Sequence, residues 1–319
     1  MHSSGSEEIS RVAVIGSGTI GASWAALFMS SGIDVIATDL SPAAEGPLRK
    51  NVAQCLRTLQ SSGTKGDAGK LVFTTDLAAA CDRADFIQES TTEREGDKVS
   101  LVTRIDAMAR PTIVIASSSS AIPITQIQRD CRRPERVVLG HPFNPAHLVP
   151  LVEVVGGERT ADWALRKAEA FYRALGKVPV RLRREAFGHV ANRLQAAIFR
   201  EAIHLLITGV ASVEEIDMVV TEGPGVRWSL MGPFLTYHLA GGPKGIMGFM
   251  MQFADMQRTL WQDLGAPEFN EQLMEQVSSV VGQAFQMRPV AGIANERDRR
   301  IAAVLAARRE AKGGEYLES

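Results

Sequence analysis

The sequence predicts an α/β fold, a doubly wound, mostly parallel Rossmann sheet followed by an all-α C-terminal domain. Three observations support this. Short runs rich in valine and isoleucine recur through the first 185 residues, with helix-like stretches between the early ones. A glycine-rich segment, "GSGTIG", begins at the end of the first run. From Gly188 onward, apolar residues instead fall at helical spacing. Alternating strands and helices indicate βαβ units around a parallel sheet.

Strands are expected where β-branched apolar residues concentrate. In chain order these runs are 11–16, 33–39, 84–90, 112–120, 136–141, 151–155 and 178–182. Helices are expected at 22–31 and 48–60, between the early strands. Because the last strand run ends shortly before Gly188, we predict a sheet domain of residues 1–187 and a helical domain of residues 188–319.

The second domain shows the helical period. "SVEEIDMVV" begins with Ser212 and has Glu215 three residues later, which is the capping-box pattern of a helix start. Further helices are expected at 243–263, 268–284 and 294–311. One face of the domain's first helix is predicted to carry Val190, Leu194, Ala197, Ile198, Ala202, Leu205 and Leu206.

Composition excludes several classes of protein. The 319 residues are 45% apolar and 22% charged, with a net charge of −1. A packed globular chain is expected, and neither nucleic acid nor a membrane is an expected partner. The three cysteines form no CxxC pair, which favours reduced thiols in a cytoplasmic protein over a disulfide framework or a zinc site. The first ten residues contain no apolar signal core.

The segment "RVAVIGSGTIG" places Gly16, Gly18 and Gly21 in a G-x-G-x-x-G pattern. The pattern is weak alone, but here it follows a strand run and begins an alanine-rich helix, which is the context of a dinucleotide site. Gly16 would allow a tight turn, Gly18 a close approach of the pyrophosphate, and Gly21 close packing of the helix on the strand. The phosphates would lie at the positive end of that helix.

Asp39 ends the second strand run, 18 residues after Gly21. Its carboxylate could accept hydrogen bonds from a ribose and would repel a 2′-phosphate, which favours NAD over NADP. The alternative is an aspartate that caps the next helix. The cofactor-binding residues predicted from this region are Gly16, Gly18, Thr19, Ile20, Gly21 and Asp39.

Two further segments end strand runs. Ligands of doubly wound sheets bind at the carboxyl ends of strands, so the serines of "SSSS" (117–120) and His141 would face one crevice. Glu153 interrupts the apolar run "LVEVV" and needs a partner if it is buried. It could accept a hydrogen bond from His141 and orient it as a general base. A polar loop, a structural histidine and an outward-facing glutamate on an edge strand are the alternatives.

Together these segments resemble the 3-hydroxyacyl-CoA dehydrogenase family. The family pattern of a serine, a histidine 21 residues later, a glutamate 12 residues after that and an asparagine before Arg-Leu falls on Ser120, His141, Glu153 and Asn192. "MGPF" (231–234) also matches, and the likeness extends from Arg11 to about Leu239.

The resemblance implies an NAD-dependent oxidation of a 3-hydroxyl group. His141 would be the general base and Glu153 would orient it. Ser120 and Asn192 would hydrogen-bond the reacting oxygen or position the substrate carbonyl. Glu93 completes the predicted cofactor-binding residues. The helical domain would supply most of a homodimer interface.

Departures from the acyl-CoA enzymes favour a free hydroxy acid as substrate. Ser118 replaces an asparagine, and "GPGVRWSL" places Arg227 and Trp228 before "MGPF". An arginine can bind a carboxylate through two hydrogen bonds, and an aromatic face can hold a trimethylammonium group. The free-acid branches with L-carnitine 3-dehydrogenase and L-gulonate 3-dehydrogenase (λ-crystallin) therefore look closer, the carnitine branch most of all. The predicted substrate-binding residues are Ser118, Ser120, Asn192, Arg227 and Trp228.

Several alternatives stay open. A gulonate-like acid or 3-hydroxybutyryl-CoA could be the substrate, and a non-catalytic, crystallin-like protein could retain the NAD site without turnover. A metal site is not expected, since the six histidines form no HxxxH or HxH pair. His147 is expected to line the substrate mouth or the surface.

Overall fold

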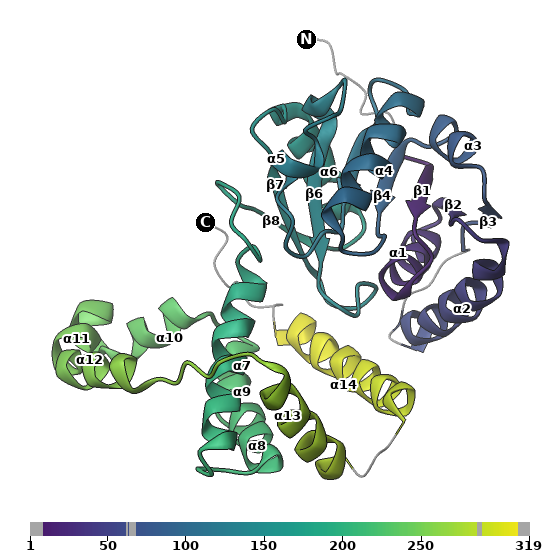
Figure 1. Ribbon diagram of the computed structural model, residues 1–319. Coiled ribbons are helices and arrows are strands. Elements are labelled where there is room, and N and C mark those ends of the chain that lie inside the picture. The colour runs from purple at the N-terminus through teal and green to yellow at the C-terminus, as the bar shows by residue number, and fades with distance from the viewer. Residues whose placement is uncertain (1–8, 62, 64–67, 286–288, 312–319) are drawn as a thin grey trace. The chain divides into compact units, whose positions relative to one another are not determined.

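The computed structural model describes residues 9–61, 63, 68–285 and 289–311 (Figure 1). These residues form two compact units. The first extends to Asn192 and includes the segment that begins at Asn295, and the second spans Arg193–Ala294. No helix among the described residues has the length and apolar character needed to cross a membrane.

One eight-stranded sheet organises the first unit, in the order β3-β2-β1-β4-β5-β6-β7-β8. Neighbouring strands are parallel except for the antiparallel pair β6 and β7. The predicted doubly wound sheet is therefore confirmed. The strands are β1 (Arg11–Ile15), β2 (Asp34–Thr38), β3 (Leu71–Thr74), β4 (Phe86–Glu89), β5 (Val114–Ser117), β6 (Val137–Pro142), β7 (Leu151–Gly156) and β8 (Val178–Arg181).

The strand β3 was not expected from the sequence. It is four residues long, it lies at the edge of the sheet, and its Val72 side chain is exposed. Such a short edge strand carries little of the apolar signal that marks the central strands, which are buried on both faces.

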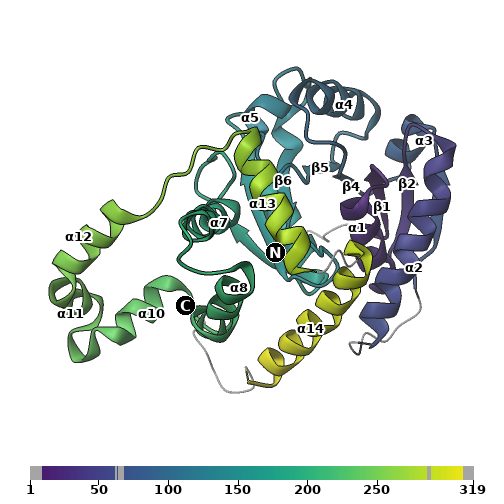
Figure 2. The same ribbon diagram turned by 60° about the horizontal axis from the view of Figure 1, so that its bottom comes forward.

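Helices cover both faces of this sheet (Figure 2). Alternate residues of each strand point to opposite faces, so Val12 and Val14 join one apolar cluster while Ala13 and Ile15 join the other. On the first face pack α1 (Thr19–Ser30), α2 (Glu45–Ser61) and α6 (Asp162–Ala174), and on the second pack α3 (Leu77–Asp82), α4 (Glu95–Met108) and α5 (Ile124–Ile127). Short 3₁₀ turns are η1 (Pro42–Ala44) and η2 (Pro134–Arg136).

The second unit is helical, as predicted. Its elements are most of α7 (Ala191–Ile207), α8 (Val213–Glu222), α9 (Pro224–Trp228), α10 (Pro233–Ala240), η3 (Gly242–Lys244), α11 (Gly245–Gln252), α12 (Ala254–Asp263) and α13 (Glu271–Ala284). The Ser212 and Glu215 capping box is present with both of its hydrogen bonds. The stretch 243–263 is helical as expected, and it consists of α11 and α12 because the backbone leaves helical geometry at Phe253.

The apolar face predicted for the first helix of this unit is largely uncovered in the single chain. Leu194 and Ile198 are exposed, Val190 just before the helix is also exposed, and Ile203 is the buried residue of α7. The helix itself is confirmed, and the second half of this face is partly covered, because Ala202, Leu205 and Leu206 are half-buried.

The last helix, α14 (Val290–Ala311), joins the first unit from Asn295 onward. Gln54 Nε2 of α2 donates to Asn295 Oδ1 at 3.3 Å, and His147 Nε2 lies 4.0 Å from Asp298 Oδ2. These contacts connect α14 to α2 and to the loop that contains His147. The domain division at residues 187 and 188 stays a prediction.

The loop between β6 and β7 is held from two sides. Ser23 Oγ of α1 accepts from the His147 backbone N–H at 3.0 Å and lies 2.6 Å from His147 Nδ1. The buried ammonium of Lys177 donates to the carbonyls of Ala146 and Val149. His147 itself is buried, so the expectation that it lines the substrate mouth or the surface was wrong. The side chain fixes the loop between two strands.

The buried His147 ring makes stability depend on pH. Burial lowers its pKa from 6.5 to about 4, although Asp298 opposes this shift. Between these values the unfolded chain binds more protons than the folded chain, so acidification lowers the free energy of unfolding, by at most about 3 kcal/mol. In urea titrations at about pH 7 and about pH 5, the wild type should lose more stability than His147→Asn, whose amide does not titrate. Parallel losses would contradict this assignment.

Candidate active site

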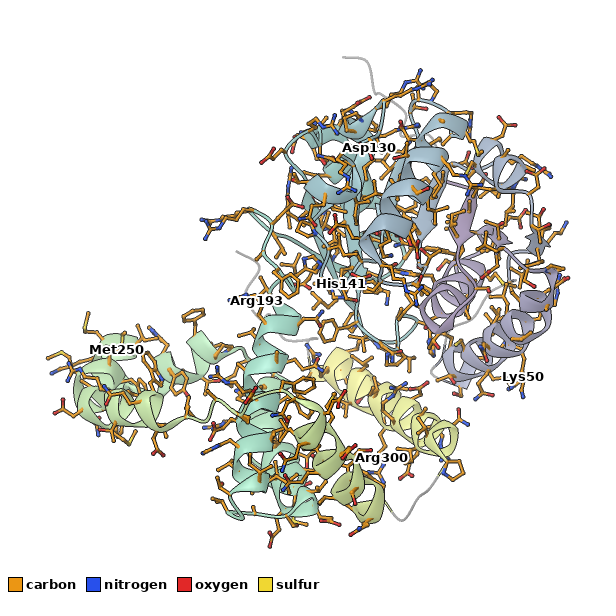
Figure 3. The ribbon with its side chains drawn as sticks, viewed as in Figure 1. Lys50, Asp130, His141, Arg193, Met250 and Arg300 are labelled. Atoms are coloured by element: carbon orange, nitrogen blue, oxygen red, sulfur yellow. The ribbon has the colours of Figure 1, made fainter. Side chains whose placement is uncertain are left out.

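Most of the predicted site residues of the first unit lie at or beyond the carboxyl ends of the parallel strands. Gly16 follows β1, Asp39 follows β2, Glu93 lies beyond β4, Ser120 lies beyond β5, and His141 lies near the end of β6. Figure 3 places His141 toward one edge of this unit and Asp130 toward the other. Ligands bind at this edge of doubly wound sheets, where the strand order reverses between β1 and β4.

The glycine loop has the close approaches that its pattern predicts. Gly16 has φ 102°, and a Cβ there would lie 2.6 Å from the Ser90 carbonyl oxygen. A Cβ on Gly21 would lie 1.9 Å from the Gly16 carbonyl oxygen. At Gly18 a Cβ would meet no atom within 4 Å, so the space beside this backbone is open.

The start of α1 suits a diphosphate. Gly18 is the N-cap, no side chain caps the first turn, and Thr19 and Ile20 begin the helix. Its N–H groups and the positive end of its dipole are therefore free to bind an anion. This cradle fits the phosphates of a dinucleotide.

Asp39 lies beside that loop. Its carboxylate accepts from the Ser17 N–H at 2.9 Å, the Leu40 N–H at 2.8 Å and the Ser17 hydroxyl. Burial alone raises its pKa, but these hydrogen bonds outweigh burial and hold the pKa below 3.8. The group is thus an anion at neutral pH, as a ribose partner that rejects a 2′-phosphate must be.

His141 and Glu153 face each other directly across the antiparallel strands β6 and β7. His141 Nδ1 lies 3.0 Å from Glu153 Oε2, and both side chains are buried. The alternative of an outward-facing glutamate is therefore wrong. The other carboxylate oxygen, Oε1, accepts from the N–H groups of Val190 and Ala191 at 2.9 and 3.0 Å.

These partners keep Glu153 ionised. Burial raises its pKa, but the hydrogen bonds from His141, Ala191 and Val190 outweigh burial, and the pKa lies below 4.5. A carboxylate on Nδ1 fixes the tautomer of His141 with the proton on that nitrogen. Nε2 of His141 makes no hydrogen bond to any residue that the structure describes, so it is available as a proton acceptor.

Ser120 and Asn192 lie together. Asn192 Nδ2 donates to the Ser120 carbonyl at 3.1 Å. Asn192 follows directly after Val190 and Ala191, the pair that binds Glu153. One stretch of chain therefore contacts both the Glu153 carboxylate and the loop of residues 118–122, called the serine loop below. Ser120 is exposed, and within the described part of the chain its hydroxyl has no hydrogen-bond partner.

Ser118 is engaged by the protein itself. Its hydroxyl accepts from Gln88 Nε2 at 2.9 Å and from Trp24 Nε1 at 3.3 Å, and it lies 2.9 Å from Ser90 Oγ. Gln88 in turn accepts from the Tyr172 hydroxyl at 2.7 Å. A substrate would have to replace one of these bonds, and the substrate-binding role of Ser118 stays a prediction.

Glu93 also binds the serine loop. Its Oε1 accepts from the Ser119 hydroxyl at 2.6 Å and from the N–H groups of Ser120, Ala121 and Ile122 at 2.9 to 3.3 Å. Burial raises the pKa of Glu93, but these bonds and Lys98 lower it overall. The carboxylate thus shapes the loop that carries Ser120, and its role in cofactor binding stays a prediction.

Sequence reasoning did not find the buried ion pair that lies next to this loop. Lys98 Nζ and the Glu89 carboxylate form a buried ion pair at 2.8 Å, and Glu89 also accepts from the Ser117 hydroxyl at 2.5 Å. No local sequence pattern predicts such a pair, because the nine residues from Glu89 to Lys98 span the end of β4 and the start of α4. Ser17 beside Asp39 was missed as well, although its place inside the glycine pattern could have suggested it.

Arg227 and Trp228 end the short helix α9 of the second unit. Both side chains are exposed, Trp228 by 42%. Their substrate-binding role stays a prediction.

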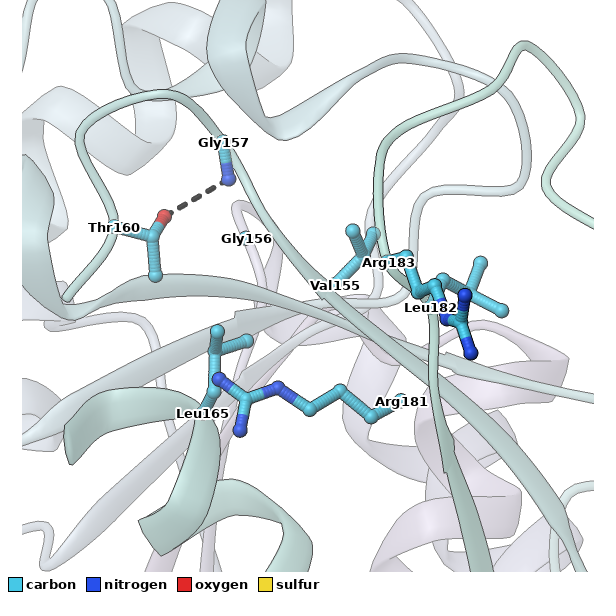
Figure 4. Close-up of a pocket in the computed structure, with 8 residues that line it drawn as sticks. All are labelled: Val155, Gly156, Gly157, Thr160, Leu165, Arg181, Leu182 and Arg183. Carbon is cyan, nitrogen blue, oxygen red and sulfur yellow. Dashed lines mark hydrogen bonds between the residues drawn. The ribbon is translucent and has the colours of Figure 1, made fainter. Parts of the chain in front are cut away.

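A surface cavity of about 330 Å³ lies elsewhere on the first unit (Figure 4). Its lining comes from the end of β7 and the residues after it, from the start of α6, and from Arg181 at the end of β8 with the two residues that follow. Within this lining, Gly157 N donates to Thr160 Oγ1. None of the predicted site residues lines it. Among the described residues, no three histidine, cysteine or acidic side chains are grouped so as to hold a metal ion.

Comparison with family models decides the relationship. The NAD-binding domain model of 3-hydroxyacyl-CoA dehydrogenase matches residues 11–186, and the C-terminal domain model matches residues 188–277. The chain belongs to the 3-hydroxyacyl-CoA dehydrogenase family. It is an NAD-dependent oxidoreductase of that type, so the predicted family, enzyme class and cofactor are confirmed.

Individual relatives agree with this assignment. An L-carnitine dehydrogenase of Pseudomonas aeruginosa is 44% identical, covering 96% of each chain, and one of Streptomyces coelicolor is 43% identical, covering 94% of this chain and 95% of its own. Among solved structures, the FHMPC 5-dehydrogenase, an NAD+-dependent dismutase, has a TM-score of 0.80 at 29% identity and covers 97% of this chain and 100% of its own. The 3-hydroxybutyryl-CoA dehydrogenase of Escherichia coli has a TM-score of 0.62 at 31% identity and covers 73% of this chain and 50% of its own.

Proposed function

We propose that this protein is a cytoplasmic dehydrogenase that oxidises the 3-hydroxyl of a short L-3-hydroxy carboxylic acid, with L-carnitine as the first choice, to the 3-keto acid. The observation that carries the proposal is the buried pair of His141 and Glu153, 3.0 Å apart at the carboxyl edge of an NAD-binding sheet. The relatives that are L-carnitine dehydrogenases support the choice of substrate.

His141 acts as the general base. Its Nε2 accepts the proton of the substrate hydroxyl, while Nδ1–H stays on the Glu153 carboxylate. The imidazolium that forms is stabilised by this buried anion, which is itself held by the Val190 and Ala191 N–H groups. NAD bound at the glycine loop would supply the acceptor for the hydride from C3 of the alcohol.

Ser120 and Asn192 orient the reacting oxygen. The Ser120 hydroxyl is free of protein partners among the described residues, and Asn192 uses one of its two N–H groups on the Ser120 carbonyl. Each therefore retains a donor for the substrate. Gly16, Gly18, Gly21 and the first turn of α1 would hold the diphosphate of NAD, and Asp39 its ribose.

Arg227 and Trp228 select the free acid. The arginine would bind the substrate carboxylate through two hydrogen bonds, and the indole face would hold a trimethylammonium group. L-Gulonate and 3-hydroxybutyryl-CoA are the competing substrates, and a non-catalytic NAD-binding protein is the alternative of a different class.

A homodimer accounts for the apolar surface of the second unit. Leu194 and Ile198 of α7 are exposed, and so are Phe234, Met251 and Trp261 of α10 to α12. Patches of this kind on a soluble chain mark interfaces. Light scattering should give twice the chain mass of 34.5 kDa. A mass of 34.5 kDa at all concentrations would refute the dimer.

The function is tested by NADH formation from NAD with four substrates: L-carnitine, L-gulonate, L-3-hydroxybutyrate and L-3-hydroxybutyryl-CoA. An alkaline buffer of about pH 9 favours a reaction that releases a proton. Turnover of L-carnitine above the others is expected. Turnover of the thioester alone would refute the free-acid assignment, and turnover of none would favour the non-catalytic alternative.

The control for this experiment is His141→Gln, which keeps a polar side chain but removes the base. Its turnover should fall by at least about a hundredfold, the usual contribution of general-base catalysis. NADH binding, followed by fluorescence, should stay unchanged because the glycine loop is intact. Full activity in this variant would exclude His141 as the base.

Arg227→Ala should raise KM for L-carnitine about tenfold or more, since a lost charge-assisted hydrogen bond costs about 1.5–3 kcal/mol. Arg227→Lys should give an intermediate KM because it keeps the charge but loses the paired geometry. KM for NAD serves as the internal reference and should not change. Wild-type kinetics in Arg227→Ala would remove this residue from the substrate site.

A further inference from the structure

His189 stands out in the first unit because its backbone is strained. Its φ of 52° makes it the one residue other than glycine with a positive φ in the described part of the chain. The side chain is 1% exposed, and its Nδ1 is buried without a hydrogen-bond partner. Both features cost free energy, and such costs persist where a site needs them.

The ring of His189 contacts both the serine loop and His141. Its Nε2 lies 3.1 Å from the Ser119 carbonyl, which can only accept, so Nε2 carries the proton. The same ring packs against His141, with centroids 5.1 Å apart and planes inclined at 50°. Burial, the largest effect, lowers the pKa of His189, so the ring stays neutral beside the base.

The backbone of His189 directs the start of α7. The two residues that follow it, Val190 and Ala191, donate their N–H groups to Glu153 Oε1. Asn192 comes next and binds the Ser120 carbonyl. The left-handed turn at His189 thus precedes three consecutive residues whose polar groups converge on the site.

We propose that His189 is a positioning residue, whose ring binds the Ser119 carbonyl and packs on His141 and whose backbone turn aims the start of α7 at Glu153. This inference rests on the proposed function. His189 touches no reacting atom. It fixes Ser120 through the neighbouring peptide, and it restricts His141 through ring packing.

The experiment compares three variants at the same position. His189→Phe keeps a ring and the backbone strain but loses the donor to Ser119. His189→Gln keeps a donor at similar reach. His189→Gly relieves the strain but removes the side chain. Circular dichroism and thermal unfolding establish first that each variant folds.

For His189→Phe we expect kcat with the hydroxy acid to fall about tenfold to a hundredfold, the scale of a misplaced reacting group, with KM for NAD unchanged. His189→Gln should recover most of kcat. His189→Gly should also lose kcat, even if its melting temperature rises. A folded His189→Phe variant with wild-type kcat overturns the inference. Wild-type kcat in His189→Gly also overturns it, because the side chain would then have no effect on the reaction.

A second readout separates this inference from the proposed function. If the wild type oxidises no hydroxy acid, the proposed function fails, and nitrogen NMR of the His141 ring then decides the inference. In the wild type the Nδ1–H tautomer should dominate, since Nδ1 faces Glu153. In His189→Phe the His141 ring-nitrogen shifts should change, because the ring that packs on His141 is no longer held by the Ser119 carbonyl, and His189→Gln should restore the wild-type signal. Identical His141 signals in all three proteins would overturn the inference.

Discussion

The buried carboxylate of Glu153 is the constraint on which the arrangement of the candidate site depends. An ion in this position is stable only if it is fully hydrogen-bonded, and its partners come from separate parts of the chain. His141 approaches from β6, and two N–H groups approach from the start of α7. Satisfying one charge therefore fixes the antiparallel register of β6 and β7 and the chain direction after Gly188.

The serine loop is also held by hydrogen bonds from several polar side chains. Glu93, Gln88, Trp24 and His189 all bind atoms of residues 118–122, and the ion pair of Glu89 and Lys98 supports them from below. These bonds use the backbone and the hydroxyls of Ser118 and Ser119. Among the described residues, these bonds leave the Ser120 hydroxyl and the His141 Nε2 without protein partners, which suits a site that must bind an alcohol.

The two units carry different sets of the predicted site residues, and function depends on such residues more than on the fold that holds them. The sheet unit carries the glycine loop and the buried pair of His141 and Glu153. The helical unit carries Arg227, Trp228 and a large exposed apolar surface.

The sequence by itself determined the sheet class, the glycine loop with Asp39, and the likeness to a known family, because these depend on local periodicity and on fixed spacings. It also suggested His141 and Glu153 as partners, but left an outward-facing glutamate possible. Only the tertiary structure decided that question, since burial and cross-strand register arise from contacts between distant segments. The same holds for β3 at the sheet edge, the buried His147 and the uncovered face of α7. His189 shows the limit most clearly: its residue type is visible in the sequence, but its strain and its contacts with Ser119 and His141 exist only once the chain has folded.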